Sequence, residues 1–98
     1  MLNQVVLVGR LTDTSWRDDE SQRGACYMAI PRSYKNADGE YDTDFIPVFM
    51  PKNIYDNTME YCRVGDIIGI KGRLEGNKDC KVVAEKVTFL SSKKSDED

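Results

Sequence analysis

The stretch DFIPVFMPK, residues 44–52, places an aromatic ring or a proline at every second position. In a β-strand, successive side chains point to opposite faces of the sheet. The rings and prolines would then share one face and the aliphatic side chains the other: Phe45, Pro47, Phe49 and Pro51 against Ile46, Val48 and Met50. Because proline has no backbone N–H to donate, Pro47 and Pro51 interrupt hydrogen bonding along one edge. The stretch predicts a strand with an aliphatic core face, a ring-lined face and one interrupted edge.

Four further segments carry strand-like patterns, which predicts a protein built mainly from strands. They are LNQVVLVGRL (2–11), ACYMAIPRSY (25–34), DIIGIKGRL (66–74) and CKVVAEKVTFL (80–90). The dipeptide Asp38-Gly39 predicts a hairpin turn before the DFIPVFMPK strand. After that strand the period becomes helical over residues 53–65, with Asn53 expected as the N-cap and Gly65 as the stop after the helix.

The order of three strands, one helix and two strands is typical of the OB fold, a small five-stranded, partly open barrel. Glycines inside the expected strands, at positions 9, 69 and 72, provide room for sharp curvature. The fold class is therefore all-β with one short helix between strands 3 and 4, and a small α+β sheet is the competing architecture. We expect one domain over residues 1–91 and a short acidic, disordered tail over 92–98.

The composition limits the classes of function that the chain can have. Its 98 residues carry a formal net charge of −3 and no histidine, which disfavours a basic nucleic-acid coat protein and most enzymes. We therefore expect no catalytic residue and no cofactor. The odd number and wide spacing of Cys26, Cys62 and Cys80 predict reduced thiols in the cytoplasm, not a disulfide framework or a zinc site. Acid pairs such as Asp18-Asp19 lack metal-site spacing, and no stretch approaches transmembrane length, so neither a metal nor a membrane is expected.

Several motifs, taken in order, resemble the bacterial and phage single-stranded DNA-binding protein (SSB) family. They are MLNQVVLVGRLT (1–12), SYKNADGEYDTDFI (33–46), EYCRVGD (60–66) and GIKGRLE (69–75). The resemblance implies an OB fold that binds single-stranded DNA without sequence preference in replication, recombination or repair. Bases stack on aromatic side chains, and Lys and Arg hold the phosphates. It also implies a homo-oligomer, a tetramer in preference to a dimer, with replication or recombination proteins as further candidate partners. Because VVLV is apolar on both faces, we expect residues 3–9 at or near the interface between copies.

The resemblance also implies which residues contact the DNA. By position, the family's stacking aromatics match Tyr34 and Phe45, and its basic residue after the third strand matches Lys52. Phe49 joins them because it lies on the same strand face as Phe45. Further phosphate contacts are expected from basic residues at strand ends or opposite the core sides of strands: Arg10, Arg32, Lys35, Lys71 and Arg73. Tyr27 and Tyr41 either join this surface or pack across neighbouring strands.

The sequence departs from the family pattern in two places within residues 1–91. An aromatic near the end of the third strand is replaced by Pro51, and the hairpin between the last two strands is shortened to EGNKD (75–79). These departures imply a compact form, resembling phage or mobile-element members, with a smaller DNA footprint. The alternative function is an OB-fold adaptor that binds protein or RNA, like the small primosomal relatives of the family. The acidic balance and the shortened hairpin favour that alternative, whereas the rings of residues 45–51 and the near-complete family resemblance favour DNA binding.

Overall fold

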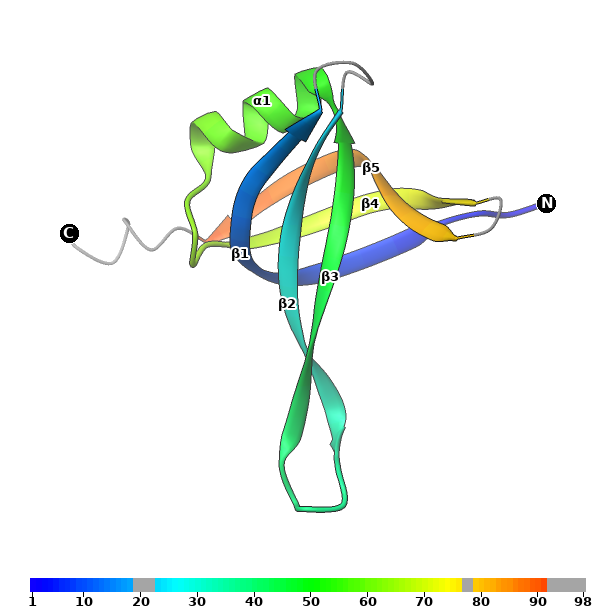
Figure 1. Ribbon diagram of the computed structural model, residues 1–98, viewed down its shortest axis with the longest axis vertical. Helices are drawn as coiled ribbons and strands as arrows, with labels where there is room; N and C mark the ends of the chain where they lie inside the picture. The colour runs from blue at the N-terminus through cyan, green and yellow to red at the C-terminus, as the bar shows by residue number, and fades with distance from the viewer. Residues whose placement is uncertain (19–22, 77–78, 92–98) are drawn as a thin grey trace.

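The computed structural model describes residues 1–18, 23–76 and 79–91, and the expected tail at 92–98 lies outside this part of the chain. The elements, in chain order, are β1 (Val5–Asp18), β2 (Arg23–Lys35), β3 (Tyr41–Pro51), α1 (Lys52–Tyr61), β4 (Ile67–Gly76) and β5 (Cys80–Ser91). The strands close into a barrel in the order β1-β2-β3-β5-β4 (Figure 1). All neighbouring strands are antiparallel except β3 and β5, which run parallel. The predicted OB-type arrangement is confirmed.

The barrel core is formed by one face of each strand and closed by α1. On β3, Val48 and Met50 are completely buried, as the alternation predicts. The core cluster comprises Leu11, Cys26, Met28, Val48, Met50, Tyr55, Cys62, Ile68, Ile70 and Ala84. Burying a large aliphatic side chain contributes about 1.5–3 kcal/mol, so these contacts dominate the stability of the domain. Within the described residues, no helix is long and apolar enough to cross a membrane.

The predicted boundaries of the helix are wrong at both ends. The helix begins at Lys52, directly after Pro51, and no side chain caps its first turn. It ends at Tyr61, where the following residue returns to an extended conformation. Gly65 has a φ of 103° but lies in the turn before β4. Its N–H donates to the Leu11 carbonyl over 2.8 Å, so a tertiary contact with β1, and not helix termination, determines the conformation of Gly65.

Strands β2 and β3 form a long hairpin that projects from the barrel, with its tip at the opposite end of the molecule from α1 (Figure 1). The pairing is regular from Arg23–Pro51 to Pro31–Thr43 and shifts before the last pair. In the predicted turn, Asn36 Oδ1 accepts hydrogen bonds from the backbone N–H groups of Asp38 and Glu40, at 2.9 and 3.0 Å. Gly39 has a φ of 79°, a conformation that favours glycine.

The second edge of β3 is paired much less completely than the first. Strand β5 pairs with it at Val48–Val82 and Phe49–Val83, whereas the β2 ladder covers the whole of β3. This limited pairing agrees with the interrupted edge that the two prolines predict. Among the described residues, the part of β3 from Tyr41 to Pro47 pairs with β2 alone, so this part of the hairpin stands apart from the barrel.

Candidate nucleic-acid interface

The outer faces of β2 and β3 form a surface, here called the ring face, that consists of Tyr27, Phe45, Pro47 and Phe49. The register places these residues in cross-strand pairs: Phe45 with Ala29, Pro47 with Tyr27, and Phe49 with Ala25. The side chain opposite each phenylalanine is only a methyl group, so it covers little of the ring. Phe45 is 63% exposed and Tyr27 39% exposed, and Phe49 is half-buried. The faces of β3 are therefore arranged as the sequence predicts, and Tyr27 lies on the ring face.

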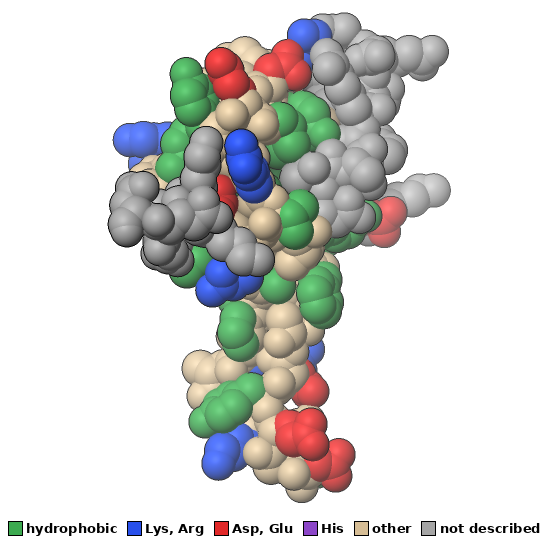
Figure 2. All heavy atoms as spheres, turned by 90° about the vertical axis from the view of Figure 1, so that its left-hand side faces the viewer, with side chains coloured by type: hydrophobic (Ala, Val, Ile, Leu, Met, Phe, Trp, Pro, Cys, Tyr) green, Lys and Arg blue, Asp and Glu red, His purple; other side chains and the backbone are tan. Residues whose placement is uncertain are grey.

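The projecting hairpin carries further exposed aromatic side chains. Tyr34 and Tyr41 are both largely solvent-exposed, on β2 and β3 respectively. Lys35 pairs with Tyr41 across the strands, and its Nζ lies 5.9 Å from the centroid of the Tyr41 ring. Figure 2 shows the hairpin from the side, with hydrophobic side chains along its length and acidic side chains gathered toward its tip. The hairpin therefore extends the aromatic surface but presents few uncompensated positive charges.

Arg32 does not lie on the ring face. Its guanidinium makes a bidentate contact with Asp44, with Nη2 2.9 Å from Oδ1 and Nε 3.2 Å from both carboxylate oxygens, and Asp42 lies 3.9 Å away. Asp44 precedes Phe45 on β3 and so points to the opposite side of the hairpin. The hydrogen bonds raise the pKa of Arg32 and lower the pKa of Asp44. Arg32 is thus occupied by carboxylates on the face away from the rings.

Two other expected phosphate ligands also contact carboxylates. Arg73 contacts Glu75 and Glu85, with 3.1 Å between Nη1 and Glu85 Oε2, and the hydrogen bond to Glu85 is the main cause of its raised pKa. Lys52 Nζ lies 2.8 Å from Asp56 Oδ2, one turn along α1. Exposed ion pairs contribute little to stability. In both cases a carboxylate competes with a phosphate for the cation.

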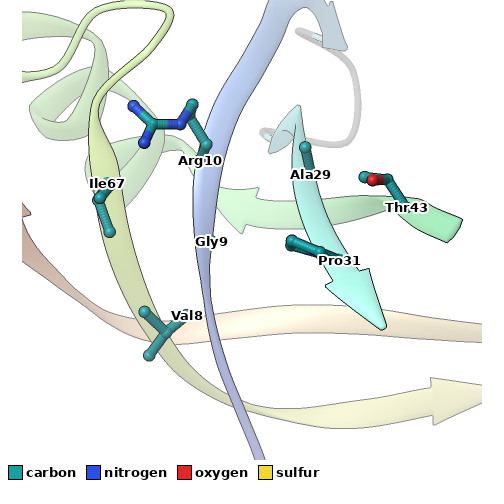
Figure 3. Close-up of a pocket in the computed structure, with 7 residues that line it drawn as sticks. All are labelled: Val8, Gly9, Arg10, Ala29, Pro31, Thr43 and Ile67. Carbon is teal, nitrogen blue, oxygen red and sulfur yellow. The ribbon is translucent and has the colours of Figure 1, made fainter. Parts of the chain in front are cut away.

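Arg10 borders a cavity of about 350 Å³ at the base of the projecting hairpin (Figure 3). The cavity is lined by Val8, Gly9, Arg10, Ala29, Pro31, Thr43 and Ile67. Figure 3 shows the Arg10 side chain extending away from Pro31 and Thr43. Its Nη1 donates to the Gly65 carbonyl over 2.6 Å, which fixes the guanidinium beside the α1–β4 turn. Arg10 pairs with Ala29, which in turn pairs with Phe45, so the register places Arg10 on the same face of the sheet as Phe45, although its guanidinium is held at Gly65.

Lys71 is exposed on β4, where it pairs with Val6 of β1 and with Lys86 of β5. Strand β5 separates it from β3, so the structure does not bring Lys71 together with the ring face. Of the nine predicted site residues, Phe45 and Phe49 share the ring face, Arg10 lies in register with Phe45, and Lys35 pairs with Tyr41 farther along the hairpin.

The sequence analysis did not predict one basic residue that lies near the ring face. Lys81, at the start of β5, places its Nζ 5.2 Å from the centroid of the Phe49 ring. The proximity arises from the short parallel pairing of β3 and β5, in which Phe49 lies beside Val83. The sequence signal was weak, because a lysine after a turn is ordinary and a parallel pairing between distant strands has no local signature.

Comparisons with known proteins agree with the fold. The model of the single-strand binding protein family matches residues 2–90. Single-stranded DNA-binding protein 2 of Staphylococcus aureus strain Mu50 is 39% identical over 106 residues, covering 95% of this chain and 75% of the relative. Single-stranded DNA-binding protein B of Bacillus subtilis strain 168 is 37% identical over 78 residues, covering 76% of this chain and 69% of the relative.

A solved structure supports the same fold at greater evolutionary distance. The structure described as Plasmodium falciparum SSB complex with ssDNA has a TM-score of 0.66 and covers 93% of this chain and 96% of that one. Its sequence identity is 19%, so this likeness concerns the fold alone. The family match and the bacterial relatives extend over most of the described barrel, and this chain belongs to the single-strand binding protein family.

Proposed function

We propose that this chain binds single-stranded DNA without sequence preference, in replication, recombination or repair. The observation that carries the proposal is the exposed ring face, in which Phe45 stands open to solvent beside Tyr27 and Phe49. Every base has a flat π-face, so stacking on such rings does not depend on base identity. The names of the bacterial relatives support the same ligand.

The salt dependence of oligo-dT binding tests this proposal. Each phosphate contact with single-stranded DNA contributes about 0.7 to the slope of log K against log salt. Because Arg32 and Arg73 are engaged by carboxylates, we expect a shallow slope of about −2 to −3, corresponding to three or four contacts. Fluorescence anisotropy at several salt concentrations measures it. Failure to bind oligo-dT even at low salt would exclude the proposed function.

The second candidate is an adaptor that binds protein or RNA. The observation in its favour is the same ion pairing, since Arg32, Lys52 and Arg73 are each compensated by a carboxylate. For a DNA-binding surface this pairing lowers the positive potential offered to phosphates. An adaptor would not bind oligo-dT at any salt concentration, so the titration above separates the two candidates.

We also propose that copies of the chain assemble through β1, as a homotetramer with a dimer as the alternative. Strand β4 pairs with β1 from Val5 to Arg10, but β2 pairs with it only from Arg10 onward. In the described ranges, the second edge of residues 5–9 therefore has no strand partner, which makes it a template for pairing with another chain. Val6 and Val8 are 65% and 53% exposed beside this edge.

The apolar surface beside this edge continues onto the neighbouring strands. Val8 pairs with Gly69, and a methyl group at Gly69 would contact Val8 and the Leu90 side chain at ordinary van der Waals distances of 3.9 and 3.4 Å. This surface spans β1, β4 and β5. Burying apolar area of this kind against a second copy supports a symmetric assembly.

Light scattering at micromolar concentration should therefore show an oligomer. We expect a tetramer in preference to a dimer. Val8→Lys places a charge on the exposed apolar surface and should dissociate the assembly while the melting temperature of the domain changes little. Thr12→Lys, on the same strand but beyond the unpaired edge, is the control. A monomeric wild-type chain under these conditions would contradict the proposed assembly.

The proposed role involves no catalysis, and the proposed location is the cytoplasm. The cysteines that the structure describes are unpaired, and Cys26 and Cys62 are buried. Burial raises the pKa of Cys26 to about 12 and that of Cys62 to about 11. Because the thiolate is the nucleophile, these two thiols are unreactive core side chains at neutral pH, which supports a binding role in a reducing compartment.

A further inference from the structure

Lys81 belongs to the same surface as Phe49. Its strand, β5, runs parallel to β3 at this point, and the pairs Val48–Val82 and Phe49–Val83 set the register. Lys81 and Val83 are two residues apart, so their side chains point to the same side of β5. The ammonium of Lys81 lies 5.2 Å from the centre of the Phe49 ring. A cation and a ring thus lie together at the edge of the ring face.

Lys81 differs from Arg32, Lys52 and Arg73 in the group that it contacts. Those side chains are engaged by carboxylates, whereas no acidic side chain in the described part of the chain lies within ion-pair distance of the Lys81 ammonium. Lys81 is solvent-exposed. Glu75 lies opposite Lys81 in the β4–β5 ladder but is engaged by Arg73, so among the described residues Lys81 loses no ion pair when it binds a phosphate.

The contact between Lys81 and Phe49 is of a kind that a nucleotide can replace. A cation–π contact at an exposed site is weaker than the stacking of a base on an aromatic ring. Lysine carries a compact charge on a flexible four-carbon stem, so its ammonium can move several ångströms by bond rotation. A base that stacks on Phe49 therefore displaces the ammonium from the ring, and the phosphate of the same nucleotide offers it a stronger partner.

We propose that Lys81 is a DNA-contacting residue that covers Phe49 in the free protein and binds the backbone phosphate of the nucleotide stacked on that ring. Phe49 and Lys81 then form one nucleotide subsite, with the base held by β3 and the phosphate by β5. The proposal rests on the proposed function, because it requires single-stranded DNA on the ring face. It assigns a phosphate contact beside the shortened β4–β5 hairpin.

The test compares Lys81→Gln with Lys86→Gln in full-length protein, using oligo-dT as the probe. Lys86 is also an exposed lysine of β5, but it pairs with Lys71 away from the ring face. For Lys81→Gln we expect binding about threefold weaker at low salt and a salt slope smaller by about 0.7. Lys86→Gln should leave both quantities at the wild-type value, and Lys81→Arg should restore the slope. None of the three substitutions should alter the melting temperature.

A double-mutant cycle with Phe49→Ala then tests whether the two side chains share one nucleotide. In the Phe49→Ala background the effect of Lys81→Gln should shrink, because the stacked nucleotide that positions the phosphate is lost. An unchanged slope for Lys81→Gln, together with weaker binding by Phe49→Ala, would overturn the subsite and leave the proposed function standing. Tighter binding by Lys81→Gln would also overturn it, since Lys81 would then only compete for the ring. If the wild-type protein does not bind oligo-dT, the proposed function itself fails.

Discussion

Replacing Phe45 with alanine should weaken oligo-dT binding by about 1–3 kcal/mol, the contribution of one stacked base, and should leave the melting temperature almost unchanged. The ring is 63% exposed and faces Ala29 across the strands, so its removal leaves no cavity in the core. The same change at a buried phenylalanine would cost about 3–5 kcal/mol of stability. Fluorescence anisotropy at fixed salt and thermal denaturation measure the two quantities on each variant.

Met50→Ala is the matched control on the other face of β3. Met50 is completely buried in the barrel core, so we expect a loss of about 2–5 kcal/mol in the free energy of unfolding. Variant protein that remains folded should bind oligo-dT with unchanged affinity. An early-melting Phe45→Ala variant with normal affinity would show that the ring stabilises the fold and does not stack on DNA.

Gly72→Ala should lower the free energy of unfolding by about 3 kcal/mol or more, at the upper end of the cost of overpacking a core. Gly72 is buried on β4, and a Cβ atom there would lie 2.0 Å from the Val83 carbonyl oxygen and 3.0 Å from Ala84 Cα. Both contacts are with the backbone of β5, so no side-chain rotation can relieve them. The register shifts at this point, leaving Glu85 as the extra residue of β5.

Gly69→Ala is the control because it makes the same chemical change on the same strand. The nearest atom to its Cβ is Leu90 Cδ1 at 3.4 Å, an ordinary contact. Reduced chain entropy in the unfolded state should make this variant neutral or more stable by about 0.4–1 kcal/mol. Chemical denaturation of both variants provides the comparison. Equal stability of the two would mean that β4 and β5 do not approach closely at Gly72.

Local patterns were sufficient to predict the strands and the two faces of β3. The period of two in DFIPVFMPK separates Phe45 from Val48 in any strand, because the direction of a side chain depends only on its position in the pleat. The Asp38-Gly39 turn is similarly local, since Gly39 adopts a positive φ that few other residues tolerate. Phe45 and Phe49 were therefore recognisable as candidate stacking residues from the pattern, whereas Tyr34 was identified through the family resemblance.

The charges of the site were much less predictable. Its place at a strand end predicts Arg32 as a phosphate ligand, but the hairpin register places it against Asp44 on the face opposite the rings. Arg73 is likewise engaged by Glu85, the extra residue of β5 at the register shift. The partner of a charged side chain depends on strand register, which a single shift changes, and a sequence alone does not specify such shifts.

The sequence by itself determined which segments form strands, which side chains face the core and where the projecting hairpin turns, because these properties depend on neighbours within a few residues. Only the tertiary structure decided where α1 begins and ends, which cations are engaged by carboxylates and which lysine lies beside Phe49. Each of these depends on contacts between residues far apart in the chain, such as Gly65 with Leu11 and Lys81 with Phe49. Closing the barrel fixes those contacts, and the parallel pairing of β3 with β5 that completes the closure has no signature in either strand.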